Sequence, residues 1–286
     1  MKVGDLAAKR AARPAMRRAA APLLLSLVLA GCGGGGGPAP QVTPTARPAL
    51  EREAGPDPPG VVSERFGRGA QSTYVIRPDR DGRRPVVLFL HGWGATLPPN
   101  YRPWLNELAG RGNVVLYPRY QDSFLTPPDQ VLGNLIVGVR LALRGVKARL
   151  RPETLVVVGH SAGGALSADY AAVARAAGLP APRAILALYP GRTLRGVASG
   201  IPEVAPRRIP PDTRVVALGG ADDATVGTAP ARRIVASATA VPRARRTYEL
   251  VEDPEVADHL GPQRATAASR RTFWARLDRL IAEVRR

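Results

Sequence analysis

The chain has 286 residues, of which 45% are hydrophobic, 22% charged and 5% aromatic, and this profile excludes a disordered or collagen-like protein. That length leaves room for one or two domains with a sizeable core. The net charge is +18, but 38 of the 41 basic residues are arginine, and these are scattered along the chain. With no recognition motif beside it, this charge does not indicate a nucleic-acid partner. A basic face directed at anionic lipid or cell-wall polymer fits it better.

The first 31 residues have the layout of a signal peptide. Six basic residues precede an apolar segment, residues 19–30, which is shorter than the roughly 20 residues of a membrane-spanning helix. It ends in Leu29-Ala30-Gly31-Cys32, which resembles the lipobox of bacterial lipoproteins, where the cysteine becomes the lipidated N-terminus. We therefore expect Cys32 to anchor the protein on the extracytoplasmic side of a membrane in a bacterial cell envelope. An ordinary secretory signal is the alternative, and Met16 is an alternative start.

The residues after Cys32 predict a tether. Cys32 is the only cysteine, which excludes a disulfide or a cysteine metal site within one chain. Gly33–Gly37 and a series of prolines up to Pro59 follow it, and such a stretch is not expected to bury an apolar face. The sequence therefore predicts three parts: a signal peptide (1–31), the lipidated cysteine with a Gly/Pro-rich tether (32–62) and a catalytic domain (63–286).

From about residue 70, short apolar runs alternate with longer amphipathic segments, which is typical of an α/β protein with a mainly parallel sheet. Strands are expected at Thr73–Arg77, Pro85–Leu90, Asn113–Tyr117, Thr154–Val158, Arg183–Leu188, Val215–Leu218 and Thr247–Val251. Helices are expected near residues 100–110, 127–144, 162–177, 229–239 and 263–285. In the second helix, Thr126, a following proline and Asp129 predict a capped start. Several strands are apolar throughout, which indicates helices on both faces of the sheet.

The most informative segment is Gly159-His160-Ser161-Ala162-Gly163, a Gly-x-Ser-x-Gly pattern between an apolar run and a helical segment. In this pattern the serine sits on a sharp turn, and a side chain at either flanking glycine would clash with the crossing backbone. The five residues alone are only moderately specific, but the strand before them and the helix after them strengthen the signal. Ser161 is therefore the candidate nucleophile.

A second segment supports the first. The apolar run Val86–Leu90 leads into His91-Gly92-Trp93-Gly94, a glycine-rich turn. Together the two segments resemble the α/β-hydrolase superfamily, and the resemblance covers about residues 70–286. It implies the α/β-hydrolase fold and an oxyanion hole made of two backbone N–H groups. At the matching positions these belong to Trp93 and Ala162.

The resemblance also implies the chain order nucleophile, acid, histidine, so the base should lie after Ser161. Of the three histidines, His91 falls in the oxyanion loop. His160 is the variable residue of the serine turn, and its side chain is expected to point away from the base. His259, just before the last helix, remains as the candidate base.

The acid is expected after the strand Val215–Leu218. The residues from Gly220 to Val226 are similar to the superfamily's Gly-x-x-Asp-x-x-Val pattern, which selects Asp223. Asp222 is one residue away and stays the alternative.

These residues imply an extracytoplasmic serine hydrolase that cleaves small-molecule or polymeric carboxylic esters through an acyl-enzyme, without a metal or organic cofactor. The segment Pro190–Asp212, where many relatives insert a lid, has little helical pattern and predicts an open site with no large cap. Trp93, Tyr101, Trp104 and Tyr120 could form the walls of this site, although packing is the simpler explanation for each.

Two alternative functions stay open: an acyltransferase that uses the same acyl-enzyme, and a non-catalytic, membrane-tethered binding module.

Overall fold

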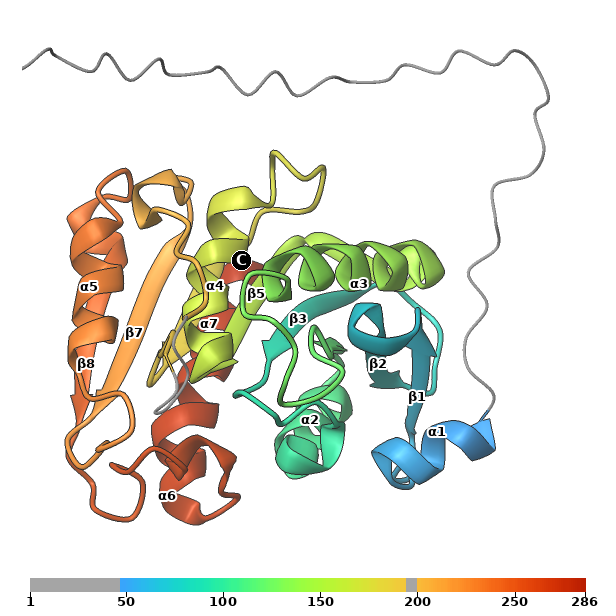
Figure 1. Ribbon diagram of the computed structural model, residues 1–286. Helices are drawn as coiled ribbons and strands as arrows, with labels where there is room; N and C mark the ends of the chain where they lie inside the picture. Colours follow the sequence, from blue (N-terminus) through green and yellow to red (C-terminus); the bar gives the residue numbers. More distant parts are fainter. Residues whose placement is uncertain (1–46, 194–199) are drawn as a thin grey trace, which may run out of the picture. The chain divides into compact units, whose positions relative to one another are not determined.

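The computed structural model describes residues 47–193 and 200–286 (Figure 1). The expected signal peptide, Cys32 and the tether up to residue 46 lie outside the described residues. Within the described ranges, no helix is both long enough and apolar enough to cross a membrane.

One eight-stranded sheet forms the centre of the domain, with the strand order β1-β2-β4-β3-β5-β6-β7-β8. Its strands are β1 (Val61–Phe66), β2 (Thr73–Pro78), β3 (Arg84–Leu90), β4 (Val114–Pro118), β5 (Leu150–His160), β6 (Ala184–Leu188), β7 (Arg214–Gly220) and β8 (Arg246–Val251). β2 pairs antiparallel with both β1 and β4, and all the other pairs are parallel. This is the mainly parallel α/β sheet that the sequence predicts.

Helices cover both faces of this sheet (Figure 1). One face is covered by α3 (Val131–Gly145), α4 (Ala162–Val173) and α5 (Ala229–Ser237). The other is covered by α1 (Arg47–Ala54), α2 (Arg102–Gly110) and α7 (Ala275–Arg285), which follows the short α6 (Ala267–Ser269) and a π-helical turn, Arg270–Trp274. In β3, Leu88 and Leu90 pack toward the first group, and Val87 and Phe89 toward the second. Because both faces are buried, the strands need apolar residues throughout.

Two elements before residue 70 were not predicted, α1 and β1. Leu50 and Ala54 of α1 lie one turn apart and are both buried in the core on the α2 side. The helix fits between prolines, because Pro48 falls in its first turn, where proline is tolerated, and Pro56 follows its end. The expectation of a tether up to residue 62 is therefore wrong for residues 47–62, which belong to the folded domain.

The start of α3 also differs from the prediction. The helix begins at Val131, and no side chain caps it. Thr126 Oγ1 instead accepts hydrogen bonds from the N–H groups of Asp122 (3.0 Å) and Ser123 (3.3 Å). The predicted cap is wrong because the Thr126 hydroxyl closes the loop before the helix and does not bind the first N–H groups of α3.

The described parts of the segment Pro190–Asp212 form no cap and contain only the 3₁₀ turn Pro206–Arg208. An ion pair to the buried Asp169 fastens this segment to α4: the half-buried Arg192 donates to both carboxylate oxygens of Asp169, at 2.8 and 2.7 Å. Asp169 also accepts the N–H of Val204 at 3.0 Å. The segment is therefore held on α4 from both sides of residues 194–199.

Candidate active site

The predicted site residues lie on loops that follow parallel strands. Ser161 stands between the end of β5 and the start of α4, Asp223 follows β7, and His259 follows β8. The carboxyl ends of parallel strands meet at one edge of a sheet, where binding sites of α/β proteins form. Residues far apart in the chain are therefore brought together at this edge.

The turn at Ser161 is strained. Its φ of 54° and ψ of −119° lie where non-glycine residues are rare. A Cβ on Gly159 would overlap the carbonyl oxygen of Gly163, and a Cβ on Gly163 would overlap the carbonyl oxygen of Leu90 in β3. Both glycines are thus required by close backbone contacts, and the tight turn holds the serine at the strand edge.

We expect Gly163→Ala to lower the free energy of unfolding by roughly 3 kcal/mol or more, because the added Cβ meets fixed backbone. Urea denaturation measures this loss. Gly133→Ala is the matched control, since nothing lies within 4 Å of a Cβ at that position in α3. It should keep the stability or raise it by up to about 1 kcal/mol. Equal stabilities of the two variants would contradict the close contact at Gly163.

The side chains of Ser161, His259 and Asp223 form one hydrogen-bonded row. His259 Nε2 lies 2.9 Å from Ser161 Oγ, and His259 Nδ1 lies 2.8 Å from Asp223 Oδ2. Because a carboxylate only accepts, Nδ1 carries the proton, and in neutral His259 Nε2 is left to accept from the serine hydroxyl. This arrangement can receive the proton of Ser161.

Asp223, and not Asp222, lies against His259. The Asp223 side chain is fully buried, and its Oδ1 accepts the N–H groups of Thr225 (2.9 Å) and Val226 (3.0 Å). Burial by itself raises the pKa of Asp223, but the hydrogen bonds from His259 and these two N–H groups bring the pKa below its usual value. Asp222 is exposed, and its N–H donates to the Ala257 carbonyl at 3.3 Å.

The loop after β3 passes beside Ser161. A Cβ built on Gly92 would lie 3.5 Å from Ser161 Cβ, and the Gly163 N–H donates to the His91 carbonyl at 3.0 Å. The N–H of Trp93 donates to none of the described residues. The N–H of Ala162 is the first of α4, where N–H groups have no partner within the helix. Both predicted oxyanion donors are therefore free to bind an oxygen atom.

His91 lies in the loop after β3 and is fully buried. Its Nδ1 lies 2.7 Å from the Gly92 carbonyl oxygen, and its Nε2 lies 2.6 Å from that of Arg119. The ring stacks on Tyr120 with 4.0 Å between centroids, and burial lowers the pKa of His91 to about 4. His91 thus connects the loop after β3 to the loop after β4.

His160 does not point away from the base, so that prediction is wrong. Its Nε2 lies 2.8 Å from the carbonyl oxygen of His259, and its Nδ1 lies 2.7 Å from the hydroxyl of Tyr101. The rings of His160 and His259 are 5.0 Å apart. Burial, and then the neighbouring His259, lower the pKa of His160 to about 3, so the ring is neutral at neutral pH. His160 therefore belongs to the surroundings of the base.

Three of the four aromatic side chains considered as walls are buried in the core: Tyr101, Trp104 and Tyr120. Their burial excludes them as walls of an open site.

Trp93 is half-buried, and its Nε1 donates to the carbonyl of Phe124 at 3.1 Å. Phe124 and Leu125 are 58% and 87% exposed, and neither was predicted as part of the site. The signal was present, because two adjacent apolar residues stand in an otherwise polar loop. Together with Trp93 they give the loops after β3 and β4 an exposed apolar surface.

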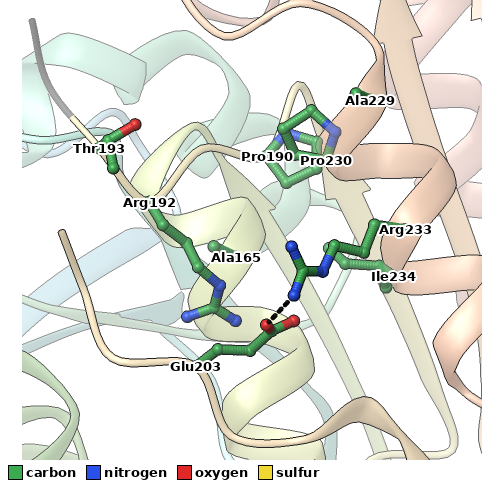
Figure 2. A pocket seen from close by; sticks show the side chains of 9 residues that line it. All are labelled: Ala165, Pro190, Arg192, Thr193, Glu203, Ala229, Pro230, Arg233 and Ile234. Atoms are coloured by element: carbon green, nitrogen blue, oxygen red, sulfur yellow. Dashed lines mark ion pairs between the residues drawn. The ribbon is translucent and has the colours of Figure 1, made fainter. Parts of the chain in front are cut away.

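A separate pocket of about 360 Å³ lies between α4 and α5 (Figure 2). It is lined by Ala165, Pro190, Arg192, Thr193, Glu203, Ala229, Pro230, Arg233 and Ile234. Both of its guanidinium groups are paired, Arg233 with Glu203 at 3.1 Å and Arg192 with Asp169. The pocket therefore suits an uncharged group better than an anion. Within residues 47–193 and 200–286 as a whole, no group of three histidine, cysteine or acidic side chains is placed to hold a metal ion.

Comparisons with known proteins agree with this architecture. A family model described as alpha/beta hydrolase fold matches residues 87–215, and no curated protein matches the sequence. A Klebsiella pneumoniae protein assigned as a dienelactone hydrolase is similar in structure, with a TM-score of 0.55, 23% identity, and coverage of 78% of this chain and 99% of that one. Esterase 2 of Thermogutta terrifontis, with propionate bound, has a TM-score of 0.62, 19% identity, and coverage of 80% and 96%. The chain therefore has the α/β-hydrolase fold, as predicted.

Proposed function

We propose that the protein is a serine hydrolase that cleaves carboxylic esters through an acyl-enzyme. The observation that carries this proposal is the hydrogen-bonded row of Ser161, His259 and Asp223. A free hydroxyl is a weak nucleophile at neutral pH, and a neighbouring base that is itself oriented by a third group makes it reactive. The matched family model and the esterases of the same fold are consistent with this chemistry.

The proposed reaction has two similar halves. His259 removes the proton of Ser161 while the serine oxygen attacks the ester carbonyl, and the Trp93 and Ala162 N–H groups bind the resulting oxyanion. Asp223 holds the tautomer of His259 and stabilises the imidazolium. His259 then donates the proton to the departing alcohol. Water repeats these steps on the acyl-enzyme and releases the acid. Each oxyanion donor of this kind contributes about 10² to 10³ in rate.

The proposed substrates are esters with a short, uncharged acyl group. The apolar surface of Trp93, Phe124 and Leu125 lies beside the oxyanion loop, and Leu260, next to the base, is 53% exposed. Such surfaces favour apolar groups that enter from solution or protrude from a polymer. Structures of the Thermogutta esterase contain propionate in one case and butyrate in another, which supports short acyl groups.

Hydrolysis of p-nitrophenyl esters tests this proposal. We expect the highest kcat/KM for the acetate or butyrate ester, with a loss of about tenfold or more for the palmitate ester. An added alcohol acceptor separates hydrolysis from acyl transfer, because an acyltransferase would make a new ester in preference to the free acid. No turnover of any ester would contradict the proposal.

We further propose that Cys32 anchors the enzyme to the extracytoplasmic side of the cell envelope. The resemblance of residues 29–32 to a lipobox supports this location. Cys32→Ser should move the protein from the membrane fraction to the supernatant after cell fractionation, while the unchanged chain stays with the membranes. Retention of the variant in the membrane fraction would contradict the anchor.

A further inference from the structure

A buried series of hydrogen bonds connects the two sides of the site. The Gly92 N–H donates to the Tyr101 hydroxyl oxygen at 3.0 Å, and that oxygen lies 2.7 Å from His160 Nδ1. His160 Nε2 lies 2.8 Å from the carbonyl oxygen of His259. Tyr101 and His160 are both buried. We call this series the Tyr101–His160 bridge, and none of its polar groups takes part in the proton transfer proposed above.

The chemistry of the groups fixes the direction of every hydrogen bond. A carbonyl oxygen only accepts, so His160 carries its proton on Nε2 and donates to His259. The neutral ring then accepts at Nδ1, which requires the Tyr101 hydroxyl to donate. The groups near the ring are His259, which disfavours a charge on it, and Asp223, which favours one. Burial outweighs both, so His160 stays neutral and the bridge has one arrangement.

The bridge joins two loops and the end of β5, which must act together. Gly92 precedes Trp93, the proposed oxyanion donor, and His160 precedes Ser161. His259 is the proposed base. Loops move more than the strands that carry them, whereas a reaction of this kind needs its groups within fractions of an ångström. The His160 ring and the Tyr101 hydroxyl thus link the backbone of the base to the backbone of the proposed oxyanion loop.

We infer that His160 and Tyr101 are positioning residues, which hold the His259 and Gly92 backbones so that the base and the oxyanion donor meet the same serine. This inference rests on the proposed function and adds to it, because neither side chain is placed in contact with substrate. A role in packing alone predicts a loss of stability with unchanged turnover per folded molecule. A positioning role predicts a loss of turnover in molecules that are fully folded.

Tyr101→Phe tests this difference, because it keeps the ring that packs 5.0 Å from Phe89 and removes only the hydroxyl. We expect kcat to fall about 10-fold to 100-fold, with KM changed less than about twofold, after active sites are counted by fluorophosphonate titration. Tyr170→Phe is the matched control: this buried tyrosine of α4 donates to the Pro180 carbonyl at 3.1 Å, outside the bridge. Its kcat should stay within about twofold of the unchanged protein.

A double-mutant cycle with His160→Gln adds a second test. If the two residues act through one bridge, the double variant loses no more activity than the worse single variant, whereas independent effects multiply. NMR of the histidine nitrogens in the unchanged protein does not depend on whether the variants fold. It should find His160 neutral, with the proton on Nε2, from about pH 5 to about pH 8. A different tautomer, or a Tyr101→Phe enzyme with unchanged kcat, would overturn the inference. No fluorophosphonate reaction in the unchanged protein would instead refute the proposed function.

Discussion

Ser161→Ala should lower kcat for ester hydrolysis by about 10⁶, because the variant has no atom that can form the acyl-enzyme. Some rate above that of water remains, since the oxyanion donors and the binding surface are still present. The backbone strain at residue 161 is unchanged by alanine, so the free energy of unfolding should stay within about 1 kcal/mol of the original. Initial rates on the preferred p-nitrophenyl ester, together with urea denaturation, measure both effects.

Ser167→Ala is the control for this substitution. Ser167 is another buried serine and lies in α4, but its hydroxyl donates to the Gly164 carbonyl at 2.7 Å and not to a histidine. We expect this variant to keep its activity within about twofold. A Ser161→Ala enzyme that keeps more than about one hundredth of the original kcat would contradict the role of Ser161.

Asp223→Asn should lower kcat by about 10⁴ while leaving the geometry of the site in place. The carboxylate accepts from His259 Nδ1, and this leaves Nε2 free to accept the serine proton. An amide can donate to Nδ1 and thereby favours the opposite tautomer, in which Nε2 is already protonated. The variant therefore lacks a working base, and steady-state kinetics measures the loss.

Asp222→Asn is the matched control. It removes the same charge at the neighbouring position, where the side chain is exposed. It should keep kcat within about twofold, since the one hydrogen bond of Asp222 among the described residues is made by its backbone N–H, to the Ala257 carbonyl. A large loss in Asp222→Asn combined with an active Asp223→Asn would reverse the assignment of the acid.

The central strands and the serine turn are predictable because their signals are local. Strands buried on both faces are apolar along their whole length, and the turn needs glycines at fixed offsets from Ser161. β1 carries no such signal. It is an edge strand, and its polar residues are stabilised from outside it, as in the ion pair of Glu64 with Arg77 of β2 at 2.8 Å. Contacts of this kind depend on tertiary structure, which a single segment does not reveal.

The same reason separates the predicted site residues from those that were missed. The residues Ser161, Asp223 and His259 were predictable because the resemblance implies their chain order and the Gly-x-x-Asp-x-x-Val pattern, and because the chain has only three histidines. The direction of the His160 side chain depends on Tyr101, which lies 59 positions earlier, and on the His259 carbonyl, 99 positions later. A pattern of five residues carries no information on either partner.

Fluorophosphonate labelling of the purified protein, followed by mass spectrometry of the modified peptide, needs no assumption about the substrate. A reactive serine activated by His259 and Asp223 predicts one modification, on Ser161, which is lost in His259→Ala. A folded protein that stays unmodified, or that is labelled equally well without His259, would contradict catalysis by this row and favour a membrane-tethered binding module.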